Sequence, residues 1–151
     1  LKEYLVKEWS ANWSVGCEAD DMLGVQQMEL GNESCIATID KDLNMIPGRH
    51  YNFVQGIQYF VTDEEAIKHF YYQCLVGDTA DGIKGVYGIG PKKANAIIAS
   101  CEAIEELHYA VAEKFSCYEE FEMNAKVLWI WRKDGDIWKD PYGRRDDVEH
   151  S

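Results

Sequence analysis

A glycine-rich segment with the sequence GIKGVYGIGPKKA, residues 82–94, restricts the backbone of this 151-residue chain more sharply than any other segment. Gly85, Gly88 and Gly90 permit a tight turn and the close approach of another backbone, because glycine has no Cβ and tolerates positive φ. Pro91 fits the first position of a helix, where its missing N–H leaves no hydrogen bond unmade. The segment therefore predicts a hairpin that leads into a helix with outward-facing free amides.

This hairpin has the features of a phosphate-binding element. Lys92 and Lys93 fall in the first turn of the predicted helix, where they can meet a phosphate that backbone amides already hold. Such contacts grip a nucleic-acid backbone and read no bases. The alternative is a plain interhelical turn in which Ile83, Val86 and Ile89 are core residues. The GxxGxGxK spacing favours phosphate binding.

Three short acidic motifs precede the hairpin. Their side chains are Glu18, Asp20 and Asp21 at a helix start, Asp40 and Asp42 after an apolar run, and Asp78 and Asp81 in GDTAD. Residues two apart point to the same side of an extended segment, and residues three apart share a face of a helical turn. Carboxylate oxygens are the ligands that Mg²⁺ and Mn²⁺ prefer. We therefore expect two divalent ions, which can activate water and stabilise both oxygens of a phosphodiester displacement.

Each acidic motif also has a structural explanation. The dipole of a helix stabilises carboxylates in its first turn, and Asp40-Lys41-Asp42 is compatible with a solvated loop. Three such motifs within one short span favour a metal site, because so many carboxylates would repel one another without a cation.

Other chemistries find little support in the sequence. The histidines, which we expect to be structural or exposed, have no ligand spacing: His50, His69, His108 and His150. The five cysteines form no CxxC pair and are expected to be small buried hydrophobes: Cys17, Cys35, Cys74, Cys101 and Cys117. Neither a disulfide framework nor a zinc site is indicated.

Composition limits the classes of protein that need consideration. A hydrophobic content of 46% predicts a globular domain, and no apolar run approaches the roughly 18 residues of a membrane span. We expect a soluble protein of the cytoplasm, or of a host cytoplasm if the chain is viral. The net charge of −12 opposes a broad basic DNA-binding face. Any DNA contact must then be local, through a few amides and lysines.

The apolar periodicity predicts a mixed α/β chain that is mostly α in its second half. Helices are expected over residues 1–12, 18–30, 62–77, 91–98, about 102–115 and 118–133, with a buried parallel strand over 35–39 and a hairpin from strands 51–54 and 57–61. The helix after Thr62 has a capping box with Glu65. Aromatic residues after Phe121, including Trp129, Trp131 and Trp138, are expected in the core and not as base-stacking platforms. The region from Asp140 is expected to be a charged, mobile tail, with Arg144 and Arg145 in solvent.

The order EADD, TIDKDL and LVGDTADGIKGVYGIGPKKA resembles the 5′ nuclease or flap endonuclease family over residues 16–98. This family includes bacteriophage 5′-3′ exonucleases and the 5′ nuclease domain of bacterial DNA polymerase I, which serve DNA replication and repair. The resemblance implies a partial PIN-like sheet followed by a helix-hairpin-helix, or helix-three-turn-helix, subdomain. It also implies that all seven acids named above are metal ligands.

The resemblance further implies how DNA is held. The hairpin would bind duplex DNA through backbone phosphates, often with a potassium ion, using Gly85, Tyr87, Gly88, Ile89 and Gly90. We expect Lys84, Lys92 and Lys93 to add DNA contacts. One departure is mild: Asp81 begins DGIKG, where many relatives have DNIPG. Relatives carry a first strand and a basic helical arch before the EADD motif, whereas seventeen residues precede Glu18 here. The expectation is a fragment or one half of a split enzyme, with a separate N-terminal segment as partner.

These observations give three hypotheses. The first is a metal-dependent DNA 5′ nuclease, with a metal-binding core over residues 1–76, a helix-hairpin-helix subdomain over 77–139 and a charged tail over 140–151. The second is a non-catalytic duplex-binding module that keeps the hairpin and uses the acids for structural metal. The third, a magnesium phosphohydrolase of small molecules, is disfavoured by the DNA-type hairpin.

Overall fold

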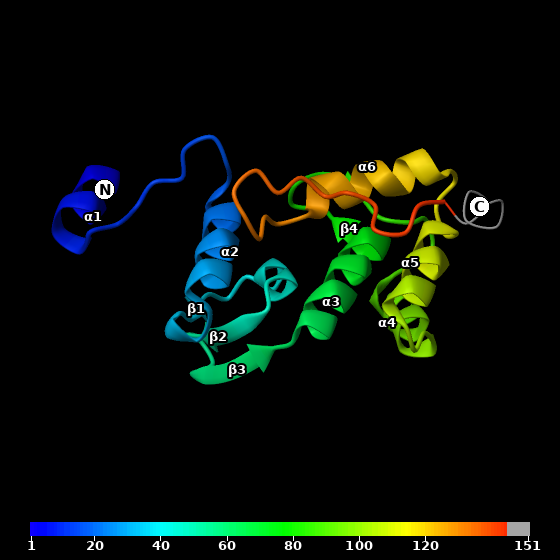
Figure 1. Ribbon diagram of the computed structural model, residues 1–151, viewed down its shortest axis with the longest axis horizontal. Helices are drawn as coiled ribbons and strands as arrows, with labels where there is room; N and C mark the ends of the chain where they lie inside the picture. The colour runs from blue at the N-terminus through cyan, green and yellow to red at the C-terminus, as the bar shows by residue number, and fades with distance from the viewer. Residues whose placement is uncertain (145–151) are drawn as a thin grey trace.

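The computed structural model of the protein describes residues 1–144. It is a mixed α/β fold in which a small sheet and a group of helices lie on either side of one long helix, α3 (Figure 1). The helices are α1 (Lys2–Trp9), α2 (Ala19–Leu30), α3 (Asp63–Val76), α4 (Pro91–Ser100), α5 (Ile104–Ala112) and α6 (Tyr118–Leu128), with short 3-10 turns η1 (Gly31–Glu33) and η2 (Asp42–Met45). The strands are β1 (Ile36–Ala37), β2 (Gly48–Asn52), β3 (Ile57–Val61), β4 (Gly77–Asp78) and β5 (Ile83–Lys84).

The larger sheet has the order β1-β2-β3. β1 pairs with β2 in parallel, and β2 pairs with β3 as an antiparallel hairpin. The predicted hairpin is thus confirmed, with its first strand starting three residues earlier. The predicted buried strand over 35–39 is only partly right, because β1 has two residues and Ile39 is exposed. β4 and β5 form a separate antiparallel pair.

Local sequence signals explain where α3 begins. The amide of Glu65 donates to Oγ1 of Thr62 over 3.1 Å, and the amide of Thr62 donates to Oε2 of Glu65 over 2.8 Å. This reciprocal capping box satisfies two amides that a helix start leaves free. The helix ends at Gly77, whose φ is +72°, a conformation that favours glycine. Both ends match the sequence prediction.

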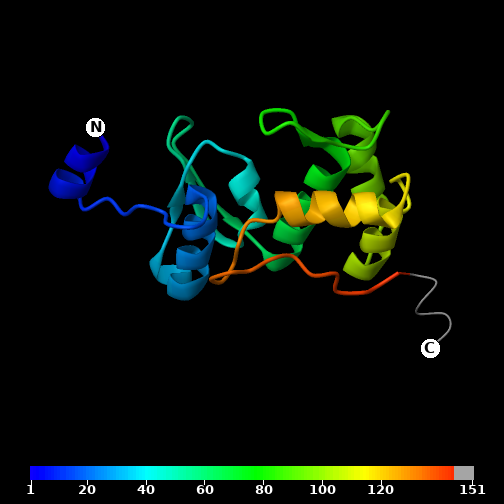
Figure 2. The same cartoon turned by 90° about the horizontal axis from the view of Figure 1, so that it is seen from above.

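The core lies where α3 meets η2 on one side and α4, α5 and α6 on the other. Its buried members include Leu43, Met45, Ile46, Phe70, Tyr71, Cys74, Leu75, Leu107, Val111, Phe121, Ala125 and Trp138. One hydrophobic cluster therefore spans the predicted boundary near residue 77, and the division into domains stays a prediction. In contrast, α1 has no buried residue and lies apart from the rest of the chain (Figure 2).

The segment after α6 differs from the prediction. α6 ends at Leu128, five residues before the expected end, and residues 129–144 run back along the helices (Figure 2). Oδ2 of Asp136 accepts hydrogen bonds from the Trp129 indole over 3.0 Å and from the Arg132 amide over 3.1 Å. These bonds hold a turn that is incompatible with a continued helix. Phe121 and Trp138 are buried, as expected, while Trp129 and Trp131 are half-buried.

The predicted mobile tail is wrong for its first residues. Asp140 accepts a hydrogen bond from the Tyr118 hydroxyl, and the Arg144 guanidinium pairs with Glu119. Arg145 and the rest of the tail lie outside the described residues. No helix among residues 1–144 is long and apolar enough to cross a membrane.

The cysteines and histidines differ in how far they are buried. Cys74 and Cys101 are buried as expected, but Cys35 and Cys117 are exposed, which corrects the prediction for those two. His50 and His108 are buried, in agreement with a structural role, and His150 lies outside the described residues.

Candidate metal and nucleic-acid site

Six of the seven predicted acidic ligands line one cavity of about 210 Å³. They are Glu18, Asp20, Asp21, Asp42, Asp78 and Asp81. They reach it from the start of α2, the start of η2 and the β4–β5 turn, so the fold brings together three motifs that are far apart in sequence. Asp40 does not line the cavity, although its charge acts on Asp20 and Asp42.

Asp21 has both of its carboxylate oxygens engaged by the protein. Its Oδ2 accepts from the Glu18 amide over 3.2 Å, which caps α2, and its Oδ1 accepts from the Trp131 amide over 2.9 Å. The second bond joins α2 to the segment after α6, which forms part of the cavity wall. Asp21 therefore positions this wall, and Asp20 is the less constrained of the two aspartates.

The Asp40-Lys41-Asp42 motif does not have the expected extended geometry. Oδ1 of Asp40 accepts from the Asp42 amide over 3.0 Å, which turns the chain into η2. The two side chains therefore do not point to one side, and only Asp42 lines the cavity. Gln73 of α3 donates to Oδ1 of Asp42 and fixes that carboxylate.

The GDTAD motif forms a turn between β4 and β5, not the helical turn that its spacing suggested. Oδ1 of Asp78 accepts from the Ala80 amide over 2.8 Å and stabilises the turn. Asp78 and Asp81 still line the same cavity. The three motifs meet at one cavity, but the local structure of this motif was wrongly predicted.

The carboxylates perturb one another electrostatically. Burial, and then the charges of Asp40, Asp78, Asp20 and Asp81, raise the pKa of Asp42 to about 6. Burial, followed by neighbouring carboxylates, also raises the pKa of Asp20. The causes are desolvation and like charge, with no lysine or arginine opposing them. A divalent cation would relieve this repulsion, so the donor chemistry of the cavity fits a hard metal ion.

The cavity is not a preformed coordination shell. In the part of the chain that the structure describes, no group of three or more His, Cys, Asp or Glu side chains is arranged so that it could hold a metal ion as it stands. The acids share a cavity without converging on one point. Side-chain rotation would be required for any of them to act as ligands together.

The glycine hairpin follows directly from the acidic turn. A Cβ on Gly85 would lie 2.3 Å from the carbonyl carbon of Val76, so the close backbone approach predicted for this glycine occurs within the chain. Gly88 has a φ of +75°, and no heavy atom lies within 4 Å of a Cβ built on Gly88 or Gly90. Tyr87 is fully exposed. The outer side of the hairpin is therefore open to a partner.

The helix after the hairpin also forms as predicted. Gly90 is the N-cap of α4 and Pro91 occupies its first position. Lys92 and Lys93 lie in the first turn, and Nζ of Lys93 donates to the carbonyl of Gly88 over 2.9 Å. Ile83, Val86 and Ile89 pack against the core, so the hairpin contributes to the core as well as presenting an open face.

Sequence reasoning missed the wall of the carboxylate cavity that comes from the end of α6 and the residues after it. This wall consists of Lys126, Val127, Leu128, Trp129, Ile130 and Trp131. Asn124, also on α6, donates to the Lys84 carbonyl over 2.7 Å and ties the helix to the start of the hairpin. The signal that was available is the apolar run VLWIW, which we interpreted only as core.

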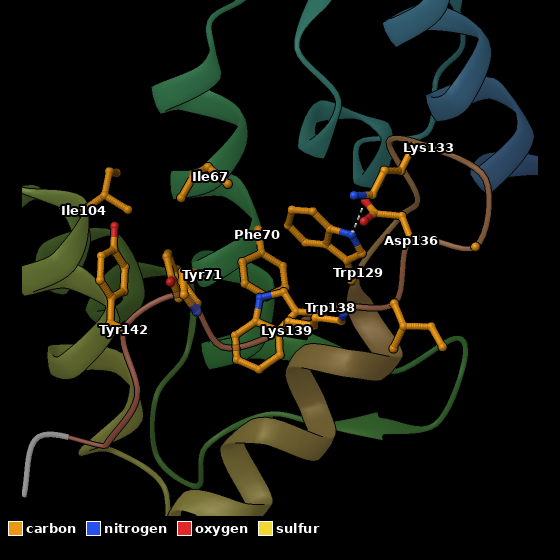
Figure 3. A pocket seen from close by; sticks show the side chains of 13 residues that line it. Ile67, Phe70, Tyr71, Ile104, Trp129, Lys133, Asp136, Trp138, Lys139 and Tyr142 are labelled. Atoms are coloured by element: carbon orange, nitrogen blue, oxygen red, sulfur yellow. Dashed lines mark hydrogen bonds between the residues drawn. The ribbon is translucent and has the colours of Figure 1, made fainter. Parts of the chain in front are cut away.

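A larger, mainly apolar cavity of about 630 Å³ has Trp129 in its lining, as the carboxylate cavity does (Figure 3). Its aromatic wall includes Phe70, Tyr71, Trp138 and Tyr142, and the Trp129 indole donates to Asp136 at its rim. None of the predicted acidic ligands lines it. Cavity size is therefore no guide to the carboxylate site.

Comparison with known proteins gives consistent relatives. No family model matches the chain. It is 28% identical over 147 residues to a thermostable DNA polymerase I of Thermus thermophilus, covering 86% of this chain and 18% of the polymerase. It is 26% identical to a flap endonuclease Xni of Shewanella sediminis, covering 83% and 53%, and 28% identical to a 5′-3′ exonuclease of Buchnera aphidicola, covering 66% and 37%.

A solved structure shares the fold. The crystal structure of T5 D15 protein, co-crystallised with metal ions, superposes with a TM-score of 0.63 at 19% identity, covering 84% of this chain and 59% of that one. The chain thus resembles 5′ nucleases and flap endonucleases in both sequence and fold. The 5′ nuclease fold inferred from its motifs is thereby confirmed. The chain spans about half or less of the length of these curated relatives.

Proposed function

We propose that this chain provides the divalent-metal site and the duplex-binding element of a DNA 5′ nuclease that hydrolyses phosphodiesters as a 5′-3′ exonuclease or flap endonuclease. The observation that carries the proposal is the single cavity lined by acids from three separate motifs, directly preceding an open glycine hairpin. The relatives named above support the reaction class.

Two Mg²⁺ or Mn²⁺ ions would supply an activated water and stabilise the charge on the oxygens of the phosphodiester. Asp20, Asp42, Asp78 and Asp81 are the residues that we propose to hold them, with Glu18 at the edge of the same cavity. Asp40 adds negative charge from outside the cavity, and Asp21 holds the cavity wall. These roles use oxygen donors only, which hard divalent ions prefer.

The hairpin would hold the duplex backbone close to this cavity. The amides at the start of α4 are free to bind a phosphate, and the dipole of the helix favours a negative charge there. Lys92, Lys93 and Lys84 would add positive charge, while Gly85, Tyr87, Gly88, Ile89 and Gly90 shape the loop. A potassium ion at the loop remains part of the proposal. Such backbone binding suits an enzyme that recognises DNA structure and not sequence.

Cleavage of a 5′-labelled flap and of a nicked duplex tests this function. The chain is assayed with Mg²⁺, Mn²⁺ or EDTA, alone and mixed with a segment that carries the part of a 5′ nuclease relative that this chain does not span. We expect metal-dependent release of short 5′ products, at least in the mixture. The double variant Asp78→Asn with Asp81→Asn should abolish it, and undiminished cutting by that variant would refute the metal assignment.

A non-catalytic duplex-binding module is the second candidate, favoured by the absence of a preformed ligand group among residues 1–144. It predicts duplex binding without cleavage in every mixture. Hydrolysis of small phosphate esters without duplex affinity would instead indicate a phosphohydrolase.

A further inference from the structure

The carboxylate cavity has one basic residue among the described residues that line it, Lys126. It lies in the last turn of α6, and no motif in the sequence drew attention to it. The rest of the polar lining is dominated by acids, so among residues 1–144 this ammonium group is the only positive side-chain charge that lines the cavity.

The charge of Lys126 is not used to neutralise the acids. Its Nζ lies 2.8 Å from Oε1 of Glu122, one turn back along α6. Lys126 is absent from the groups that shift the pKa of Asp20 and Asp42, where only burial and other carboxylates act. The lysine therefore lines the cavity while its ammonium is directed to a neighbour on its own helix.

The pair with Glu122 is easily exchanged for another anion. Both side chains are substantially exposed, 47% for Lys126 and 36% for Glu122, and exposed i,i+4 pairs contribute little because water and salt screen them. A lysine side chain is long and flexible, and its ammonium is a compact charge that binds phosphate well. A phosphodiester that entered the cavity would find this lysine as the basic group of the described wall.

The end of α6 links the hairpin and the acidic cavity. Asn124 anchors α6 to the Lys84 carbonyl, immediately before Gly85 of the hairpin, and residues 126–131 then form the wall of the acidic cavity. The end of α6 therefore contacts the start of the hairpin and also lines the acidic cavity.

We propose that Lys126 leaves Glu122 to bind a backbone phosphate of the DNA strand at the acidic cavity, and so is a substrate-binding residue of the nuclease. The inference rests on the proposed function and assigns to the C-terminal helix a contact that neither the acidic motifs nor the hairpin supplies. Glu122 competes with the phosphate and sets how readily the lysine is released.

Salt-dependent DNA binding tests the proposal without requiring turnover. The affinity of the full chain for a 5′-phosphorylated flap duplex is measured by fluorescence anisotropy in Ca²⁺ over a range of KCl concentrations. Each phosphate contact contributes about 0.9 to the slope of log affinity against log salt. Lys126→Ala should weaken binding by roughly threefold to tenfold and lower this slope by about one. Lys126→Arg should restore both.

Two controls separate charge from structure. Lys114→Ala removes the same charge from an exposed position two residues after α5, outside the residues that line the cavity, and should leave the slope unchanged. Glu122→Gln should tighten DNA binding more in the wild-type background than in Lys126→Ala, because only the former has a lysine to release. Equal tightening in both would reflect only the loss of a negative charge. Thermal unfolding verifies that every variant is folded.

The outcomes distinguish this proposal from the function on which it rests. If Lys126→Ala binds the flap duplex with wild-type affinity and slope while Gly90→Asp weakens binding, the lysine proposal is overturned and the duplex-binding hairpin stands. If the wild-type chain itself does not bind the duplex, the proposed function fails together with it.

Discussion

The backbone amide of Trp131 donates a hydrogen bond to Oδ1 of Asp21 over 2.9 Å, although the two residues are 110 positions apart. The neighbouring Asp20 has no comparable bond to the wall and instead experiences the charges of the surrounding acids. Two adjacent aspartates of one motif thus have different surroundings. A motif-based assignment treats them as equivalent, but their hydrogen bonds predict opposite effects on stability.

We expect Asp21→Ala to destabilise the protein by about 1–3 kcal/mol, because it leaves the Glu18 and Trp131 amides without their acceptor. Asp20→Asn should leave the metal-free stability unchanged or slightly higher, since it removes repulsion. Urea unfolding in EDTA measures both. Equal destabilisation by the two variants would show that Asp21 has no special structural role.

Asp42 should limit the stability of the metal-free protein at neutral pH. Its pKa in the folded state is about 6, above the unfolded value near 3.9, so the folded state loses stability as the pH rises through about 6. Asp42→Asn keeps the oxygen that accepts from Gln73 but removes the charge. After allowance for solvent screening, we expect it to stabilise the protein at pH 8 by roughly 1 kcal/mol, and to have little effect near pH 4.

Stabilisation by Mg²⁺ is a second test of the role of Asp42. A ligand that binds only the folded state raises the free energy of unfolding, and with it the unfolding temperature, with the logarithm of its concentration relative to Kd. Wild-type protein should be stabilised by Mg²⁺ at pH 8, and Asp42→Asn should respond much less. A variant that is less stable than wild type in EDTA, or equally responsive to Mg²⁺, would contradict the interpretation of this carboxylate.

His108 should produce a pH dependence of the opposite sign. It is buried between the hydroxyls of Tyr71, at 2.9 Å, and Tyr118, at 3.3 Å. Burial lowers the pKa of His108, although the nearby Asp140 carboxylate acts to raise it. The imidazole is therefore neutral at neutral pH, and its 3.4 Å contact with Asp140 is not an ion pair there. The unfolded chain takes up a proton near pH 6.5 while the folded one resists it, and stability is lost as the pH falls below that value.

The variant His108→Gln, made in an Asp42→Asn background that removes the opposing titration, should flatten the decline in unfolding free energy between pH 7 and 5. His50 and His69, whose pKa values are also lowered by burial, account for the remaining slope. Urea unfolding at several pH values provides the measurement. An unchanged slope would mean that His108 has the same pKa in the folded and the unfolded chain.

The sequence signals that mark the starts of helices were interpreted correctly. The Thr62–Glu65 capping box and the Gly90-Pro91 helix start depend on neighbouring residues, and both form as predicted. The gathering of the acids followed from the family resemblance and from charge. What could not be predicted depends on distant partners: Asp136 ends α6 early through Trp129 and Arg132, and Trp131 reaches Asp21 only in the folded chain.

The acidic spacing rules failed for a different reason, which is local. Asp40 and Asp78 each accept a hydrogen bond on a side-chain oxygen from the backbone amide two residues ahead. These bonds form turns where we expected an extended segment for Asp40 and a helical turn for Asp78. Aspartate commonly forms such local bonds, and these compete with regular secondary structure. The same acids that line the cavity therefore also determine the backbone that carries them.

Two glycines of the hairpin should respond differently to substitution. A Cβ on Gly85 would lie 2.4 Å from the Leu75 carbonyl oxygen and 2.3 Å from the Val76 carbonyl carbon, so Gly85→Ala should destabilise the fold. Gly90 has a φ of −93° and open space around it, and aspartate is a favourable N-cap. Gly90→Asp should thus preserve or slightly raise stability, while its charge and bulk repel a phosphate at the start of α4.

We expect Gly90→Asp to weaken binding of a flap duplex by at least about tenfold at low salt, because a negative charge replaces an open phosphate site. Asn32→Asp, which adds the same charge at an exposed position in η1, is the matched control and should have little effect. Anisotropy in Ca²⁺ gives the affinities, and thermal unfolding verifies the fold. Equal affinities for Gly90→Asp and Asn32→Asp would place the DNA contact away from the start of α4, whatever the acidic cavity does.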